Sequence, residues 1–320
     1  MKTVQTVCGK ISPKDLGFTL MHEHIFSSAP GIAENYPQLY VDNAFEIAIN
    51  DLKAAQARGV SSIVDATPFD LGRDPKNLKK ASEESGVNII ATTGWFEPVS
   101  PFVGIHSIDK FASVFIDDIE KGMAGTDIKA GLIKATMDSE GCTAPRELMH
   151  RAAARASNAT GIPVFMHSNP IHETGRHQIR IMKEEGVPMR RVKIDHCLET
   201  TDMDYLHWLA DQGCWMGVDR LPLMTTIGKY AIATETRIKT IKNMIDAGMA
   251  KQMLSHDFPV TSTCFDHLDA KNQAFFNTIN PQRLQFLTDV AFPKLVSWGV
   301  SESVLHEICY DNPRRFFEGC

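Results

Sequence analysis

The sequence predicts an α/β fold, a (β/α)8 TIM barrel in which eight parallel strands form a cylinder inside a ring of helices. Two observations support this prediction. Eight short, mostly apolar runs follow one another along the chain, and segments with helical spacing separate them. Apolar runs of this kind are typical of strands that are covered on both faces. The runs are residues 18–25, 61–67, 88–95, 130–136, 163–169, 192–197, 214–219 and 253–258.

Most of the segments between these runs carry a polar residue near their start and a glycine at their end, as helices do. Asp74, for example, precedes Pro75, which suits the first turn of a helix, and Gly86 ends the same segment. Eight strand–helix units close a barrel, and no linker or change in composition divides the chain. We therefore expect one domain over residues 1–320. The expected helices include residues 43–59, 74–86, 201–213, 236–247 and 312–319.

The composition excludes several classes of protein. Hydrophobic residues make up 43% of the 320 residues and charged residues 22%, which is typical of a soluble globular protein. The net charge is −6 and Lys and Arg do not cluster, which argues against a nucleic-acid partner. No apolar run is long enough for a membrane span or a signal peptide. The chain has seven cysteines, which is an odd number, and no two of them form a CxxC motif. We therefore expect reduced thiols and a cytoplasmic location.

The stretch "TLMHEHIF", residues 19–26, overlaps the first run and contains two histidines one residue apart. Strand side chains alternate between faces, so His22 and His24 point the same way and Glu23 points the opposite way. A single buried histidine usually finds a backbone partner, but two on one face are harder to satisfy. A metal ion would satisfy both, because neutral imidazole is a favoured ligand. Asp65 and Thr67, at the end of the second run, are candidates to hold ligands by hydrogen bonds.

Four more residues with ligand chemistry lie at the ends of other runs: Lys134, His167, His196 and Asp257. Active sites of these barrels lie at the carboxyl ends of the strands, so all four are expected at one end with the histidine pair. A buried lysine tends to lose its proton. A neutral amine reacts with carbon dioxide to give a carbamate, an anionic ligand that can bridge two metal ions. Taken alone, Lys134 could instead form an ion pair, but the joint pattern favours a metal site.

This order of residues resembles the phosphotriesterase family of the amidohydrolase superfamily. The similarity runs from "LGFTLMHEHIF" through "IKAGLIK", "VFMHS", "IDHC", "MGVDR" and "LSHDF" to "DNPRRFF". It implies two divalent metal ions, with Zn²⁺ as the default and Mn²⁺, Co²⁺ or Fe as alternatives. Relatives are often dimers, so the resemblance allows a homodimer, but the sequence itself does not indicate the oligomeric state. The implied ligands are His22, His24 and Asp257 for the more buried ion, His167 and His196 for the more exposed one, and N6-carboxylated Lys134 between them.

Two adjacent metal ions lower the pKa of a bridging water and polarise a substrate oxygen. We hypothesise that a metal-bridging hydroxide attacks a carboxylic ester, a lactone or phosphorus, and that Asp257 accepts its proton. The resemblance implies that an acid three residues after His196 relays this proton. Glu199 stands at that position, where several relatives carry Asp.

Three further residues are expected to contact the substrate. Arg220 follows the seventh run and matches the arginine of lactonase-like members, although a pair with Asp219 or another acid at a strand end is an alternative. Trp95 and Phe96 follow the third run and are suited to line an apolar pocket, but ordinary packing explains them equally. Lactonase-like members usually carry a tyrosine where Phe96 stands, so the resemblance is weaker there.

The sequence therefore predicts a binuclear metal-dependent hydrolase that cleaves an ester or lactone, with phosphotriester cleavage as a side activity. Hydrolysis of phosphate or phosphonate esters, or of N-acyl amides, is an alternative with the same metal centre. A barrel that binds a small ligand without turnover is the alternative outside enzymes. Residues 220–233 and 259–280 are long connections at the expected active-site end, and such loops set the choice of substrate.

Overall fold

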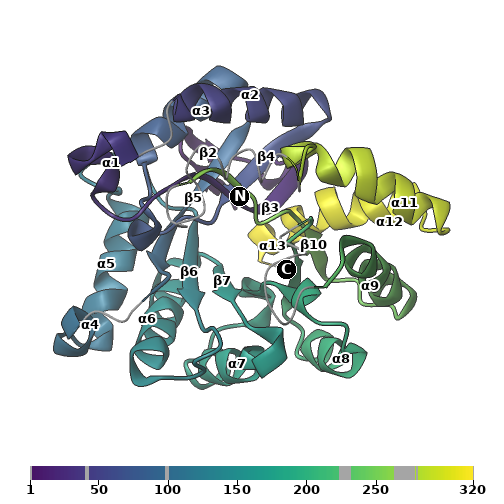
Figure 1. Cartoon of the computed structure of the whole chain (residues 1–320). Coiled ribbons are helices and arrows are strands. Elements are labelled where there is room, and N and C mark those ends of the chain that lie inside the picture. The colour runs from purple at the N-terminus through teal and green to yellow at the C-terminus, as the bar shows by residue number, and fades with distance from the viewer. Residues whose placement is uncertain are drawn as a thin grey trace.

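A computed structural model describes residues 2–39, 43–97, 101–222, 232–262, 278 and 280–319. Helices surround an inner sheet on all sides in the view along the barrel (Figure 1). Among the described residues the sheet has nine strands in the order β10-β9-β8-β7-β6-β5-β4-β3-β11, and every pairing in it is parallel. The predicted (β/α)8 barrel is confirmed.

The eight predicted runs correspond in order to eight strands of this sheet. These are β3 (Phe18–Ser27), β4 (Val60–Asp65), β5 (Asn88–Trp95), β6 (Leu132–Thr136), β7 (Val164–His167), β8 (Val192–Ile194), β9 (Trp215–Val218) and β10 (Gln252–Leu254). A short antiparallel hairpin, β1 (Val4–Thr6) and β2 (Gly9–Ile11), precedes them.

The segment after the eighth run contains a strand that was expected as irregular chain. β11 (Pro259–Ser262) pairs with β3, in the register that places Pro259 beside His24. Between β10 and β11, the backbone N–H of Asp257 donates to the carbonyl of His22 at 2.9 Å. The N–H of His24 donates to the carbonyl of Phe258 at 3.1 Å. These bonds close the sheet into a barrel and fix the end of β10 beside the histidine pair.

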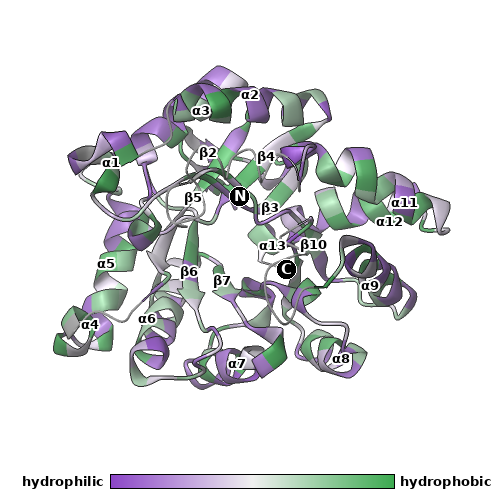
Figure 2. Ribbon diagram, viewed as in Figure 1, coloured by the Kyte–Doolittle hydropathy of each residue, from purple (hydrophilic) through white to green (hydrophobic). Residues whose placement is uncertain are grey.

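The helices are amphipathic elements with one face in solvent, and Figure 2 shows hydrophilic and hydrophobic residues around each of the larger ones. The side chain of Asp74 accepts from the backbone N–H of Asn77 at 3.0 Å, so the predicted N-cap of α3 is present. Asn43, in contrast, begins α2 without a side-chain cap, because its backbone is left-handed. In the described part of the chain the α-helices are α1 (Ile32–Asn35), α2 (Ala44–Ala57), α3 (Pro75–Ser85), α4 (Pro101–Ile105), α5 (Ile108–Glu120), α6 (Ala144–Thr160), α7 (Thr174–Glu184), α8 (Met203–Asp211), α9 (Thr234–Asp246), α11 (Phe292–Ser297), α12 (Glu302–His306) and α13 (Asn312–Glu318).

An apolar cluster separate from the main core fills the barrel interior. It consists of Val4, Leu16, Met21, Val64, Ile90, Leu132, Phe165, Trp215, Met253 and Phe316. Strand residues two positions apart point the same way, so Lys134 and His167 follow Leu132 and Phe165 on the inner face. The polar side chains of the interior therefore gather above this apolar layer, toward the carboxyl ends of the strands.

Within the described residues, no helix has both the length and the apolar character to cross a membrane. Residues 223–231 and 263–277, which form most of the two long connections expected at the active-site end, lie outside the described part of the chain.

Candidate metal centre

The first group of expected ligands comes together where the chain that follows β10 runs beside the middle of β3. His22 is fully buried, and its Nε2 lies 3.5 Å from Oδ1 of Asp257. Nε2 of His24 lies 3.3 Å from the same oxygen. Two imidazole nitrogens and one carboxylate oxygen thus face a common point. Burial lowers the pKa of His22 to about 3, so its ring is neutral and available as a ligand.

The second group is a pair of buried histidines: His167 is the last residue of β7, and His196 follows the neighbouring strand β8. Nδ1 of His167 lies 2.8 Å from Nε2 of His196. Burial lowers the pKa of His167 to about 4 and holds that of His196 well below its ordinary value. Two neutral imidazoles that face each other through ring nitrogens offer two lone pairs to one cation.

Lys134 lies between these two groups and is almost completely buried. Its Nζ is 2.9 Å from Nε2 of His22 and 5.9 Å from the ring centre of Phe96. No carboxylate of a described residue forms an ion pair with this amine, so the structure does not favour the alternative of a simple ion pair. Burial lowers the pKa of Lys134, which favours the neutral amine that a carbamate requires.

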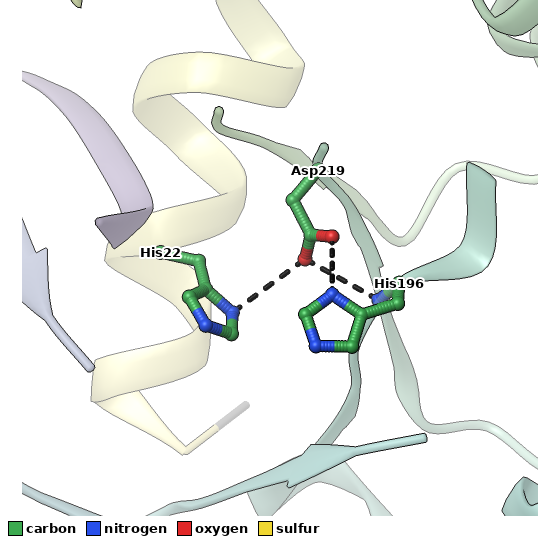
Figure 3. Close-up of side chains that lie close together, drawn as sticks. All are labelled: His22, His196 and Asp219. Atoms are coloured by element: carbon green, nitrogen blue, oxygen red, sulfur yellow. Dashed lines mark hydrogen bonds and ion pairs between the residues drawn. The ribbon is translucent and has the colours of Figure 1, made fainter. Parts of the chain in front are cut away.

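Carboxylate and hydroxyl groups behind the histidines set the orientation of the rings. Oδ1 of Asp219 is 2.7 Å from Nδ1 of His196, which leaves Nε2 of that ring free of hydrogen toward His167. The Asp219 carboxylate lies between His22 and His196, and the three form one cluster (Figure 3). Oγ1 of Thr67 is 2.8 Å from Nδ1 of His24, in the supporting position that the sequence indicated for Thr67.

A buried charge pair lies directly below the centre, and sequence reasoning missed it. Lys193 Nζ contacts Oδ1 of Asp195 and lies 3.7 Å from the ring centre of Phe165. Oδ2 of Asp195 is 3.2 Å from Nδ1 of His22. Burial opposes ionisation of Asp195, but Lys193 and His22 outweigh it and lower the pKa of this carboxyl. The only signal in the sequence is that two charged residues alternate with apolar ones in the sixth run, and this pattern does not identify their partners.

The three residues expected to take part in catalysis also come together. Nε of Arg220 donates to Oδ2 of Asp257 at 2.9 Å, and Nη1 lies 3.7 Å from Oε2 of Glu199. Glu199 forms a second ion pair, at 2.6 Å, with Nη1 of Arg237 on α9. Burial acts against the charge of Arg220, but the three carboxyls of Asp257, Glu199 and Asp219 raise its pKa. Arg220 thus bridges two acids. This arrangement corresponds to the alternative in which Arg220 forms an ion pair, but its partners are Asp257 and Glu199 and not Asp219.

Phe96 lies at the edge of the centre, with its ring centre 5.2 Å from that of His167. Its backbone is held on both sides. The Asp70 carboxylate accepts from the Phe96 N–H at 2.8 Å, and Arg146 on α6 donates to the Phe96 carbonyl at 2.7 Å. The ring is therefore a fixed wall beside Lys134.

Trp95 points into a different environment, although it is adjacent to Phe96. Its ring packs edge to face on Phe69 and Phe111, at centre distances of 5.3 and 5.7 Å. It also stacks on Phe102 at 6.4 Å. These contacts agree with the alternative that Trp95 takes part in ordinary packing and does not line a substrate pocket.

A second histidine lies behind His167 and outside the ligand set. Nε2 of Gln178 donates to the carbonyl of His167 at 2.7 Å and lies 3.1 Å from Nε2 of His150. Nδ1 of His150 is 2.7 Å from the carbonyl of Arg146, which only accepts, so Nδ1 carries the hydrogen and Nε2 accepts. His150 is fully buried, and burial lowers its pKa from 6.5 to about 4.

We expect the free energy of unfolding of the His150→Asn variant to fall less steeply at acid pH than that of wild type. Because the folded-state pKa is lower than 6.5, the unfolded chain binds the proton first, and stability is lost as the pH falls from 6.5 toward 4. Wild type should lose about 2 kcal/mol more than the variant between pH 7 and pH 5. Urea unfolding of the metal-free proteins at both pH values measures this. Equal losses in the two proteins would show that His150 does not contribute.

A (β/α)8 barrel with histidines, a lysine and carboxylates gathered at the carboxyl ends of its strands defines a class, the metal-dependent hydrolases on this fold. The model of the phosphotriesterase family matches residues 2–317, and the chain belongs to this family. An aryldialkylphosphatase of Saccharolobus solfataricus is 36% identical over 312 residues, which cover 96% of each chain. A phosphotriesterase homology protein of Mycobacterium tuberculosis is 35% identical and covers 99% of this chain and 98% of its own. The human N-acetyltaurine hydrolase is 26% identical, and the match covers 98% of this chain and 97% of the human protein.

The family uses divalent metal ions, and the donor sets of the centre fit them. Within the described residues, His22, His24 and Asp257 bring one ligand atom each within 4.8 Å of one another. His22, His196 and Asp219 are equally close, but Asp219 is bonded to Nδ1 of His196 and orients that ring. Two neutral imidazoles and a carboxylate are a ligand set that zinc-type ions prefer.

Proposed function

We propose that this chain is a binuclear metal-dependent hydrolase of carboxylic esters or lactones. The observation that carries the proposal is the approach of His22 and His24 to one oxygen of Asp257, at 3.5 and 3.3 Å, with Lys134 Nζ 2.9 Å from the first ring. One ion would lie at this group, and a second would lie at the pair of His167 and His196. Zn²⁺ is the ion we propose, with Mn²⁺, Co²⁺ or Fe as replacements.

Lys134 is the proposed bridging ligand in its N6-carboxylated form. The neutral amine would attack carbon dioxide and form a C–N bond. Loss of one proton from the nitrogen then gives the carbamate anion. Burial supports this step because it lowers the pKa of the amine, and the anion formed would be compensated by the cations that it binds.

When bound, the metal ions would polarise a substrate carbonyl and lower the pKa of a water molecule. The side chains provide the remaining functions. Asp257 faces the histidines through Oδ1 and Arg220 through Oδ2, so it is placed to accept the proton of the attacking water. Glu199, beyond Arg220 and partly exposed, would carry that proton outward. The ring of Phe96 lies beside the amine of Lys134, with its centre 5.9 Å from Nζ, and would form one wall of the site.

The charge around Arg220 supports a neutral substrate. The guanidinium lies between Asp257 and Glu199, so its positive charge is largely compensated where it stands. It retains donors for a carbonyl oxygen but offers little net charge to a phosphate dianion. An ester or a lactone therefore suits this pocket better than a phosphate monoester does.

A phosphotriester is also neutral, and the 36% identical relative is named an aryldialkylphosphatase. This similarity supports phosphotriester cleavage as a side activity of the same centre. An N-acyl amide is the third substrate for a test, because the human relative is named an N-acetyltaurine hydrolase.

Metal analysis and a substrate screen test the proposal together. We expect about two transition-metal equivalents per chain, loss of hydrolysis after a chelator, and recovery with Zn²⁺. Lactones, aryl esters, phosphonate esters, phosphotriesters and N-acyl amino acids form the screen, and lactones or esters should give the highest kcat/KM. Protein that binds no metal and hydrolyses nothing would contradict the proposal and favour a ligand-binding barrel.

A further inference from the structure

The carboxylate of Glu23 lies on the opposite face of β3 from the histidine pair and is completely buried. It contacts one short segment, the chain between β10 and β11. Its Oε1 accepts from Oγ of Ser255 at 2.7 Å and lies 2.9 Å from the backbone N of His256 and 2.7 Å from its Nδ1. Its Oε2 accepts from the backbone N–H of Phe258 at 2.9 Å.

All four partners of Glu23 are donors. Nε2 of His256 lies 3.3 Å from the backbone N–H of Leu287, which can only donate, so the proton of the ring is on Nδ1. Oγ of Ser255 accepts from the backbone N–H of His22 at 2.8 Å and therefore gives its own hydrogen to Glu23. Three donors converge on Oε1 and one on Oε2, an arrangement that suits an ionised carboxylate.

The two backbone amides that Glu23 binds lie on either side of Asp257. The φ of Asp257 is +53°, a left-handed conformation that is unfavourable for a residue with a side chain. Glu23 binds the amide before this residue through Oε1 and the amide after it through Oε2. These bonds hold the left-handed turn, and the turn directs Oδ1 of Asp257 toward the two histidines.

We propose that Glu23 is a positioning residue that acts through Asp257, by fixing the backbone turn that presents the Asp257 carboxylate to the metal centre. This inference rests on the proposed function, because it concerns a ligand of the proposed centre. The inference gives Glu23, the middle residue of the HxH pattern, a role of its own that differs from the role of the two histidines.

Glu23→Gln tests this role with almost no change in shape. The amide oxygen would stay where three donors converge, so the NH₂ group would face the N–H of Phe258 and that bond would be lost. Asn312→Leu is the matched control, because Asn312 donates to the carbonyls of Ala250 and Gln252, both at 2.8 Å. In both variants the new side chain is close in shape to the one it replaces. Glu23→Gln removes a bond to the backbone after the end of β10, and Asn312→Leu removes bonds to the backbone at its start.

The readouts are urea unfolding, Zn²⁺ retained against a competing chelator, and kcat. We expect both variants to lose stability, but only Glu23→Gln to weaken Zn²⁺ binding, by about 10–100-fold, as outer partners of metal ligands do. We also expect the loss of kcat from Glu23→Gln to disappear in an Asp257→Asn background, since residues that act through one another are not additive.

Equal Zn²⁺ loss in Asn312→Leu would overturn the inference, and so would a full additional loss of kcat from Glu23→Gln in the Asp257→Asn background. If Glu23→Gln does not fold, Glu23→Asp replaces it, because it keeps the charge but shortens the side chain by one CH₂ group. A loss of Zn²⁺ affinity and of kcat is expected in the same readouts, and an unchanged protein would contradict the role. A wild type without metal or hydrolysis would refute the proposed function. An active wild type with an unaffected Glu23→Gln would refute this inference alone.

Discussion

The substitution Asp257→Asn is expected to lower kcat by about two to four orders of magnitude, the usual contribution of a group that transfers a proton in the transition state. Asparagine keeps an oxygen in the position of Oδ1, which faces His22 and His24. It replaces Oδ2, which accepts from Arg220, by an NH₂ group that cannot accept a proton. Steady-state kinetics at equal metal content measure the effect.

Asp51→Asn is the control for this prediction. Asp51 is a similarly buried carboxyl that pairs with Nε of Arg283, away from the centre. Its substitution should lower the free energy of unfolding and leave kcat unchanged. Near-normal turnover of the Asp257→Asn protein with both metal ions bound would exclude Asp257 as the proton acceptor.

The sequence was sufficient to place the strands and the histidine pair because barrel topology restricts both. Parallel strands in one barrel end at one edge, so residues far apart in the chain, such as His22 and Asp257, must approach each other there. Alternation along β3 also placed Glu23 opposite the histidines. That rule holds as long as the backbone stays extended.

The rule fails where the chain leaves the strand. His196, Arg220 and Asp257 have φ values of +65°, +62° and +53°, so each side chain is directed by a left-handed turn that alternation does not describe. Such conformations in residues other than glycine depend on surrounding hydrogen bonds, which come from distant parts of the chain. The sequence alone therefore could not show that Arg220 would bridge Asp257 and Glu199.

The supporting carboxylates were difficult to predict for a different reason. Asp219 is adjacent to Arg220 in the sequence and was considered only as its partner, but in the fold it is bonded to His196. Lys193 and Asp195 interrupt an apolar run, and only the closed barrel shows that they face its interior beneath His22. The partners of a buried charge are set by packing, which local patterns do not specify.

Lys134→Met is expected to abolish activity without a loss of stability in the metal-free protein. Methionine has nearly the same length, and the position is buried with no ion pair to a described carboxylate. Burial already lowers the pKa of Lys134, so removal of the amine removes a group that is costly to bury. Loss of a bridging ligand should nevertheless lower kcat more than about 100-fold, because outer partners alone contribute 10–100-fold.

Lys193→Met distinguishes a ligand from a structural ion pair. Lys193 is equally buried but contacts Asp195, so its removal leaves a buried carboxylate without its cation and should cost about 3–5 kcal/mol of stability. Urea unfolding and metal analysis of both variants separate the two roles. The two lysines should give opposite results: Lys193→Met loses stability, and Lys134→Met loses metal. If Lys134→Met instead retained two ions and normal kcat, or unfolded as readily as Lys193→Met, Lys134 would be a structural residue, and the centre would have to be held by histidines and carboxylates alone.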